Sequence, residues 1–120
     1  MNRKELTRAY KETAKPLGIF QVRNTINGRV LIGSSVDVPS RLNRERAQLA
    51  LGTHSNKELQ SEWRTFGAEA FDFTTLDTLE PRDDPDDDPR ADLAALEHMW
   101  IDKLEPFGER GYHTAARRAG

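Results

Sequence analysis

The sequence GIFQVRNTINGRVLIGSS, residues 18–35, places an Asn-Gly pair between two short apolar runs. Asn-Gly is the pair most typical of a tight turn between antiparallel strands, because both residues tolerate positive φ angles. We therefore predict strands over 19–23 and 29–32, joined by a turn at Asn27 and Gly28.

The register of this hairpin decides how Phe20 and Leu31 are placed. If Ile26 lies opposite Arg29, Phe20 and Leu31 share one face of the sheet. A pairing shifted by two residues, toward a longer loop, would keep that face, because side chains alternate with a period of two. We expect such a shift to make Phe20 and Leu31 direct neighbours.

Helix signals flank the hairpin. A helix is expected over 2–14, before Pro16. Another is expected over 39–51, with Asp37 as its N-cap, a proline in its first turn, and Gly52 at its end.

The second half of the chain predicts two more helices and a strand. Ser55 and Glu58 form a capping-box pattern before a helix that ends at Gly67. Residues 69–79 are rich in β-forming types, and Asp88 is expected to cap a last helix that starts at the next residue and runs to about residue 105. The segment that follows, GERGYHTAARRAG, is expected to be irregular. The apolar stripe of the helix before Gly67 is Leu59, Trp63 and Phe66.

The order of elements, α-β-β-α-α-β-α, predicts an α/β fold with a small three-stranded antiparallel sheet flanked by helices. A chain of 120 residues is expected to form one domain. We place it at 17–114, after a basic helix at 1–16 and before a tail at 115–120. No apolar run approaches the roughly 18 residues of a membrane span, and residues 1–15 lack the apolar stretch typical of a signal peptide, so we expect no membrane partner. The absence of cysteine excludes disulfides and a cysteine nucleophile, and fits a cytoplasmic protein.

Charge is unevenly distributed along the chain. The net charge is −2, but the stretch DDPDDD at 83–88 holds five aspartates, and without them the remainder carries +3. This distribution permits a basic face for nucleic acid, and equally a solvated mixed surface. The acidic stretch is interpreted as a solvated loop, with a weak divalent-ion site as the alternative, because it lacks the glycine and the final glutamate of an EF-hand.

A carboxylate lies inside the apolar stripe of the last predicted helix. Glu97 falls between Leu93 and Trp100 on that stripe. A buried carboxylate needs an ion pair, hydrogen bonds or a metal. The residue types leave open a structural glutamate at the stripe edge and a metal ligand. The remaining stripe residues are Leu96, Ile101 and Leu104.

The helix over 39–51 repeats this pattern. Glu45 falls on its apolar stripe and Arg41 on the edge of the stripe, four residues before it. This spacing suits a local ion pair. It also suits an arginine that presents its planar fork of donors to a phosphate.

His54, Asn56 and Lys57 lie at the start of the next helix. The free N–H groups and the positive dipole end of a helix N-terminus favour anions. These residues are therefore candidates for phosphate contact, or else ordinary surface residues.

Taken together, these motifs resemble the GIY-YIG nuclease family, in particular its small homing-endonuclease-like branch. GIF at 18–20 stands at GIY, and LIG at 31–33 stands at YIG. Arg41 stands at the catalytic arginine and Glu97 at the metal-binding glutamate, while GYH at 111–113 stands where many members have GYN. The resemblance covers nearly the whole chain.

The resemblance implies a DNA endonuclease that uses one divalent metal, Mg²⁺ or Mn²⁺. Glu97 would hold the metal against the scissile phosphate, and Arg41 would stabilise the transition state at the same phosphate. A lone domain would have little sequence preference, or would depend on a partner or a dimer. His54 is a candidate catalytic base, and the expected substrate contacts are Phe20, Leu31, Gly33, Asn56, Lys57 and His113.

The chain departs from the family pattern at several of these positions. Phe20 and Leu31 replace both motif tyrosines, and His113 replaces the terminal asparagine. Glu45 replaces a frequent histidine, and would either pair with Arg41 and close the site to phosphate or add a metal ligand. Three interpretations follow. The first is a working nuclease that uses another base, such as a histidine or metal-bound water. The second is a degenerate module that binds nucleic acid or regulates without cutting, and the third is a protein-interaction domain.

Overall fold

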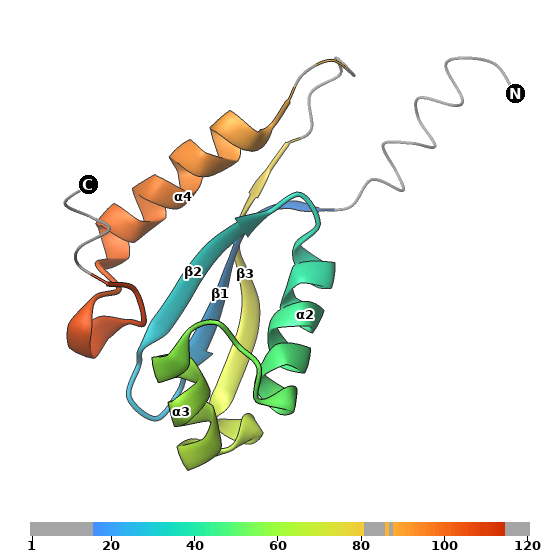
Figure 1. Cartoon of the computed structure of the whole chain (residues 1–120). Coiled ribbons are helices and arrows are strands. Elements are labelled where there is room, and N and C mark those ends of the chain that lie inside the picture. The colour runs from blue at the N-terminus through green and yellow to red at the C-terminus, as the bar shows by residue number, and fades with distance from the viewer. Residues whose placement is uncertain (1–15, 81–85, 87, 115–120) are drawn as a thin grey trace, which may run out of the picture.

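The computed structural model describes residues 16–80, 86 and 88–114. A three-stranded sheet lies at its centre, and all neighbouring strands are antiparallel (Figure 1). The strands, in the order β2-β1-β3, are β1 (Leu17–Asn24), β2 (Val30–Ser35) and β3 (Phe71–Leu79). The predicted fold class is therefore confirmed.

Three predicted features lie outside the described residues. They are the helix over 2–14, most of the acidic loop at 83–88, and the tail at 115–120.

Helices cover both faces of the sheet (Figure 1). α2 (Val38–Leu51) and α3 (Lys57–Phe66) pack on one face, and α4 (Arg90–Leu104) packs on the other. The predicted stripe of α4 is confirmed, because Leu96, Trp100, Ile101 and Leu104 cover Ile19, Val30 and Ile32. In the part of the chain that the structure describes, no helix is long and apolar enough to cross a membrane.

The hairpin of β1 and β2 is shifted by two residues toward a longer loop. Phe20 lies opposite Gly33, and Val22 lies opposite Leu31. Phe20 and Leu31 share a face, as predicted, because residues 20 and 22 point the same way. The expectation that this shift would make them direct neighbours is wrong, since they are diagonal across the pair. The turn contains the predicted glycine, Gly28, at a φ of 80°.

The pairing of β1 with β3 contains a bulge, because the register shifts between Ile19 and Phe20. Leu76 is the extra residue, and it packs with Ile19 on the face that α4 covers. Asp77, opposite Ile19, lies on that face too. Its Oδ2 accepts a hydrogen bond from Trp100 Nε1 at 2.9 Å, which links β3 to α4.

The helix termini follow the predicted signals with two exceptions. Asp37 caps α2 by accepting from Ser40 N, and Gly52 ends this helix at a φ of 78°, as predicted. The capping box at α3 is wrong, because Asn56 is the N-cap and accepts from Leu59 N at 3.0 Å. α4 begins at residue 90, one residue later than predicted, and its N-cap is Pro89 and not the predicted Asp88, although Asp88 Oδ1 accepts from the N–H of residue 90. Phe66, predicted in the apolar stripe of α3, is 41% exposed.

The segment after α4 is ordered against β2 as far as residue 113, although it was expected to be irregular. Tyr112 is buried in the core under α2 and α3, and its N–H donates to the carbonyl of Val30. His113 Nε2 accepts a hydrogen bond from Ile32 N at 2.9 Å. This segment therefore covers part of the outer edge of β2, which a sheet would otherwise leave unpaired.

Candidate active site

Phe20 forms the floor of the candidate site. Its ring is almost fully buried, and a Cβ at Gly33 would lie 2.4 Å from the ring carbon Cζ. Only glycine therefore fits opposite this ring. Leu31 is half-buried on the same face and packs against the core under α2 and α3.

Arg41 lies in the first turn of α2, above this floor. Its Cζ is 5.2 Å from the centroid of the Phe20 ring, which is within the range of a cation–π contact. The side chain is 34% exposed. The guanidinium therefore contacts the protein on one side and solvent on the other.

Glu45 and His54 are buried behind Arg41. Arg41 Nε donates to Glu45 Oε1 at 2.8 Å, so the local ion pair that the spacing suggested is present. The other oxygen of Glu45, Oε2, is bonded to His54 Nε2. Both side chains are 3–4% exposed, and both carboxylate oxygens are occupied by protein groups.

Two backbone groups fix the orientation of the His54 ring. Its Nδ1 accepts a hydrogen bond from Asn56 N at 3.0 Å, so the proton of the neutral ring lies on Nε2, which donates to Glu45. The N–H of residue 54 donates to Gln60 Oε1. His54 thus has no free basic nitrogen, and the geometry suits it to hold Glu45 rather than to accept a proton from water.

The surroundings of Glu45 favour its ionised form. Burial opposes this, but hydrogen bonds from His54 and Arg41 lower the pKa of Glu45 below the usual value of 4.5. A buried carboxylate with two donors is stable as an anion. Glu45 is therefore a fixed negative charge beneath Arg41 near neutral pH.

The pair with Glu45 uses only one edge of the guanidinium. Among the described residues, no group hydrogen-bonds to Nη1 or Nη2 of Arg41. These nitrogens form the fork that binds a phosphate in a bidentate manner. Glu45 therefore pairs with Arg41 without occupying its Nη edge.

Glu97 lies on α4, which packs on the opposite face of the sheet from α2, the helix that carries Arg41 (Figure 1). Its side chain is half-buried beside the residues that contact β1 and β2. The structure does not bring Glu97 and Arg41 into contact. With the residues that the structure describes, the Glu97 carboxylate forms no hydrogen bond or ion pair, so the structural alternative of a bonded glutamate finds no partner there.

The donor set near Glu97 fits only one mode of metal binding. Across residues 16–80, 86 and 88–114, no three His, Asp or Glu side chains form a cluster that could enclose a metal. Mg²⁺ is often held by one or two carboxylates together with water and substrate phosphates. An unpaired, half-buried carboxylate fits that open mode, in which the substrate completes the site.

Three other predicted substrate contacts have defined places. Asn56 caps α3 and donates from Nδ2 to the carbonyl of Tyr112 at 2.8 Å. Lys57 is exposed at the start of the same helix. His113 receives the edge N–H of β2. Asn56 therefore has a structural use, whereas Lys57 is placed on the surface.

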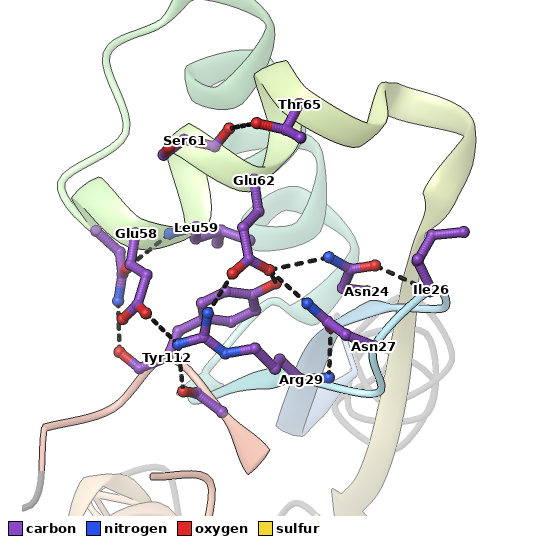
Figure 2. Close-up of polar contacts among 12 residues, drawn as sticks. Asn24, Ile26, Asn27, Arg29, Glu58, Leu59, Ser61, Glu62, Thr65 and Tyr112 are labelled. Atoms are coloured by element: carbon purple, nitrogen blue, oxygen red, sulfur yellow. Dashed lines mark hydrogen bonds and ion pairs between the residues drawn. The ribbon is translucent and has the colours of Figure 1, made fainter. Parts of the chain in front are cut away.

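A second polar cluster was not predicted as a unit from the sequence. Glu62 on α3 accepts hydrogen bonds from Asn24, Asn27 and Tyr112, and forms an ion pair with Arg29 (Figure 2). Burial would raise the pKa of Glu62, but the bonds from Asn27 and Tyr112 and the charge of Arg29 lower it. For Tyr112, burial and the bond to Glu62 raise the pKa of the phenol. We call these five residues the Glu62 cluster.

The signal that marked Glu45 and Glu97 also applies to Glu62. Glu62 lies three residues after Leu59 and one before Trp63, at the edge of the apolar stripe of α3. The stripe marks the carboxylate, but its donors come from the hairpin and from the C-terminal segment. Only the tertiary fold brings these together.

Comparison with known proteins follows this geometry. No protein-family model matches the chain. Over 87 residues, the chain is 30% identical to intron-associated endonuclease 1 of Enterobacteria phage T4. The matched region covers 72% of this chain and 32% of that protein. It also resembles two solved structures of the catalytic domain of the homing endonuclease I-TevI, at 27% identity. One has a TM-score of 0.66 and covers 80% of this chain and 95% of the other; the second, a mutant, has a TM-score of 0.63 and covers 75% and 84%.

The comparisons confirm the resemblance that the motifs indicated. The chain spans about a third of the curated relative. It spans nearly all of the solved catalytic domain. The part of the chain that matches the solved structures therefore corresponds to the region described there as the catalytic domain of I-TevI.

Proposed function

We propose that the chain is a GIY-YIG-like nuclease domain of the homing-endonuclease type and that it cleaves phosphodiester bonds of DNA with one divalent metal ion. The observation that carries the proposal is the way the Arg41 guanidinium is bonded. Its Nε edge is fixed by a buried carboxylate, its Cζ lies over an aromatic ring, and its Nη edge is free of the described residues. This is the arrangement expected of an arginine that receives a phosphate.

In this proposal Arg41 binds the scissile phosphate and Glu97 is the carboxylate that holds the metal. The metal, Mg²⁺ or Mn²⁺, supplies Lewis-acid stabilisation of the charge that develops on the phosphate. Both α2 and α4 contact β2, which is an edge strand. We therefore place the phosphate at the β2 side of the sheet, where groups from both faces can reach it.

The two apolar motif positions predict a slow enzyme. A positioned general base contributes about 10²- to 10⁴-fold to a rate. Phe20 and Leu31 offer no hydroxyl, and the basic nitrogen of His54 is occupied by Asn56 N. The attacking water would have to lose its proton to solvent or to a group beyond these positions.

The test is nicking of supercoiled plasmid DNA in the presence of Mg²⁺ or Mn²⁺. We expect cleavage that chelation abolishes, and a loss of several orders of magnitude in Glu97→Ala. Glu109→Ala, which removes an exposed glutamate, is the matched control and should cleave normally. Absence of cleavage, or full activity in Glu97→Ala, would contradict the proposal.

The second candidate is a module that binds DNA without cutting it. The apolar pair Phe20 and Leu31 is the observation that favours it. It predicts binding that weakens steeply as salt rises, because phosphate contacts release counterions, with no cleavage in either metal. DNA binding that is insensitive to salt would exclude it.

A further inference from the structure

Glu45 and His54 do not touch the solvent-facing edge of Arg41, yet they determine where that edge lies. We propose that they act as a fixed pair that positions Arg41 for its phosphate. The inference rests on the proposed function, since the phosphate is the ligand that Arg41 would meet. It assigns to Glu45 and His54 a positioning role, in place of a base or a metal ligand.

The first step is the immobility of Glu45. Its side chain is 4% exposed, and each of its oxygens accepts from a different side chain. A carboxylate held at both oxygens cannot rotate. Arg41 Nε is therefore held at a fixed point, and the guanidinium carbon Cζ rests over the Phe20 ring, 5.2 Å from its centroid.

The second step is the origin of this rigidity in the backbone. His54 Nδ1 accepts from Asn56 N, and the N–H of His54 donates to Gln60 Oε1. Gln60 Nε2 in turn donates to the carbonyl of Leu49 on α2 at 3.0 Å. The pair is thus linked to the backbone at the start of α3 and at the end of α2. These two helix ends therefore fix the position of Arg41 through Glu45.

The third step is the chemical requirement at residue 45. Arg41 Nε is only a donor, and His54 Nε2 must carry the ring proton because Nδ1 is an acceptor. Both groups need an acceptor on residue 45. A glutamate supplies two acceptors, whereas a glutamine supplies one acceptor and one donor, so either orientation of glutamine loses one bond.

The decisive experiment is a double-mutant cycle on the cleavage rate. Glu45→Gln should lower kcat about tenfold to 10²-fold, since misplacing a reacting group by about 1 Å costs that much. In an Arg41→Ala background, Glu45→Gln should cause no further loss, because it acts only through Arg41. Glu69→Gln, an exposed glutamate with the same change of charge, is the control. An equal loss in both backgrounds, or no loss in the wild-type background, would overturn the proposal.

A second measurement needs neither DNA nor cleavage. The ¹⁵N resonances of the His54 ring should show a protonated Nε2 and an unprotonated Nδ1 at neutral pH, and Glu45→Gln should shift the Nε2 resonance. A proton on Nδ1 would overturn the pair, even if Glu45→Gln fails to fold. If the wild-type chain does not cleave DNA, the proposed function fails, while this spectrum still decides whether the pair exists.

The rescue variant separates positioning from packing. His54→Gln keeps an acceptor for Asn56 N and a donor for Glu45, whereas His54→Leu keeps neither. We expect the glutamine variant to retain more activity than the leucine variant at similar KM. Equal loss of activity in both would overturn the role of His54.

Discussion

Two arginine–glutamate groups lie against α2 and α3, and they differ in how their arginines are used. In the Glu62 cluster, both Nη groups of Arg29 are bonded, to Glu58, Glu62 and the carbonyl of Gly111, and its plane lies over Tyr112 (Figure 2). At the candidate site, Arg41 gives only Nε to Glu45. A nearly saturated arginine serves the fold, whereas an arginine that gives only Nε to a buried carboxylate keeps its Nη groups free of the described residues.

The largest expected effect is in the Glu62 cluster. Glu62→Ala removes the acceptor of Asn24, Asn27 and Tyr112 and leaves Arg29 without the less exposed of its two carboxylate partners. Breaking a buried ion pair in this way costs about 3–5 kcal/mol. Urea unfolding at pH 7 should show this loss of stability. A loss below about 1 kcal/mol would contradict the structural role.

In contrast to Glu62→Ala, Arg41→Ala should cause a large loss of rate and a smaller loss of stability. Removing a charged donor from a transition state costs about 10²- to 10³-fold in kcat. Its side chain is one-third exposed, and Glu45 keeps its bond from His54, so the unfolding free energy should fall by less than in Glu62→Ala. Arg44→Ala, an exposed arginine on the same helix, is the control for charge. Equal rates in the two variants would remove Arg41 from the site.

Because of Glu45 and Glu62, we expect the folded chain to lose stability in acid. This loss should be smaller than the effect of deleting either carboxylate. The pKa of Glu62 and that of Glu45 are both lowered in the folded chain, from an ordinary 4.5. Such groups stabilise the fold fully above the unfolded value, and this stabilisation is lost as pH falls through the folded values. Urea unfolding should therefore show that the stability difference between wild type and Glu62→Gln is largest near pH 7 and shrinks toward pH 3. A difference that is constant with pH would contradict the lowered pKa.

The sequence predicted the elements and the buried charges, because both are local patterns. Asn27-Gly28 predicted the hairpin, and carboxylates on apolar stripes predicted that Glu45 would be buried. His54, nine residues after Glu45, was predicted as a candidate catalytic base but not as the hydrogen-bond partner of Glu45. Helical periodicity does not contain the loop geometry that turns the His54 ring toward α2.

The errors of prediction arise where tertiary contacts override local signals. Asn56, and not Ser55, is the N-cap of α3, because its side chain also donates to the backbone carbonyl of Tyr112. The bulge at Leu76 and the packing of Tyr112 depend on partners more than 30 residues away. The C-terminal segment was predicted to be irregular for the same reason, since its hydrogen bonds go to β2.

The smallest expected effect is a gain, and it tests the apolar floor directly. Leu31→Tyr places a phenol on the same face as Phe20 and Arg41, where the resemblance implies a hydroxyl. A general base contributes about 10²- to 10⁴-fold when ideally placed, so an unrefined replacement should gain about tenfold in kcat. Leu31→Phe is the matched control, because it carries the same ring and the same packing cost without the oxygen. A faster tyrosine variant, with an unchanged phenylalanine variant, would show that Arg41 is already placed and that only the hydroxyl is missing. Equal rates in the two variants would mean that this face of the hairpin does not adjoin the attacking water.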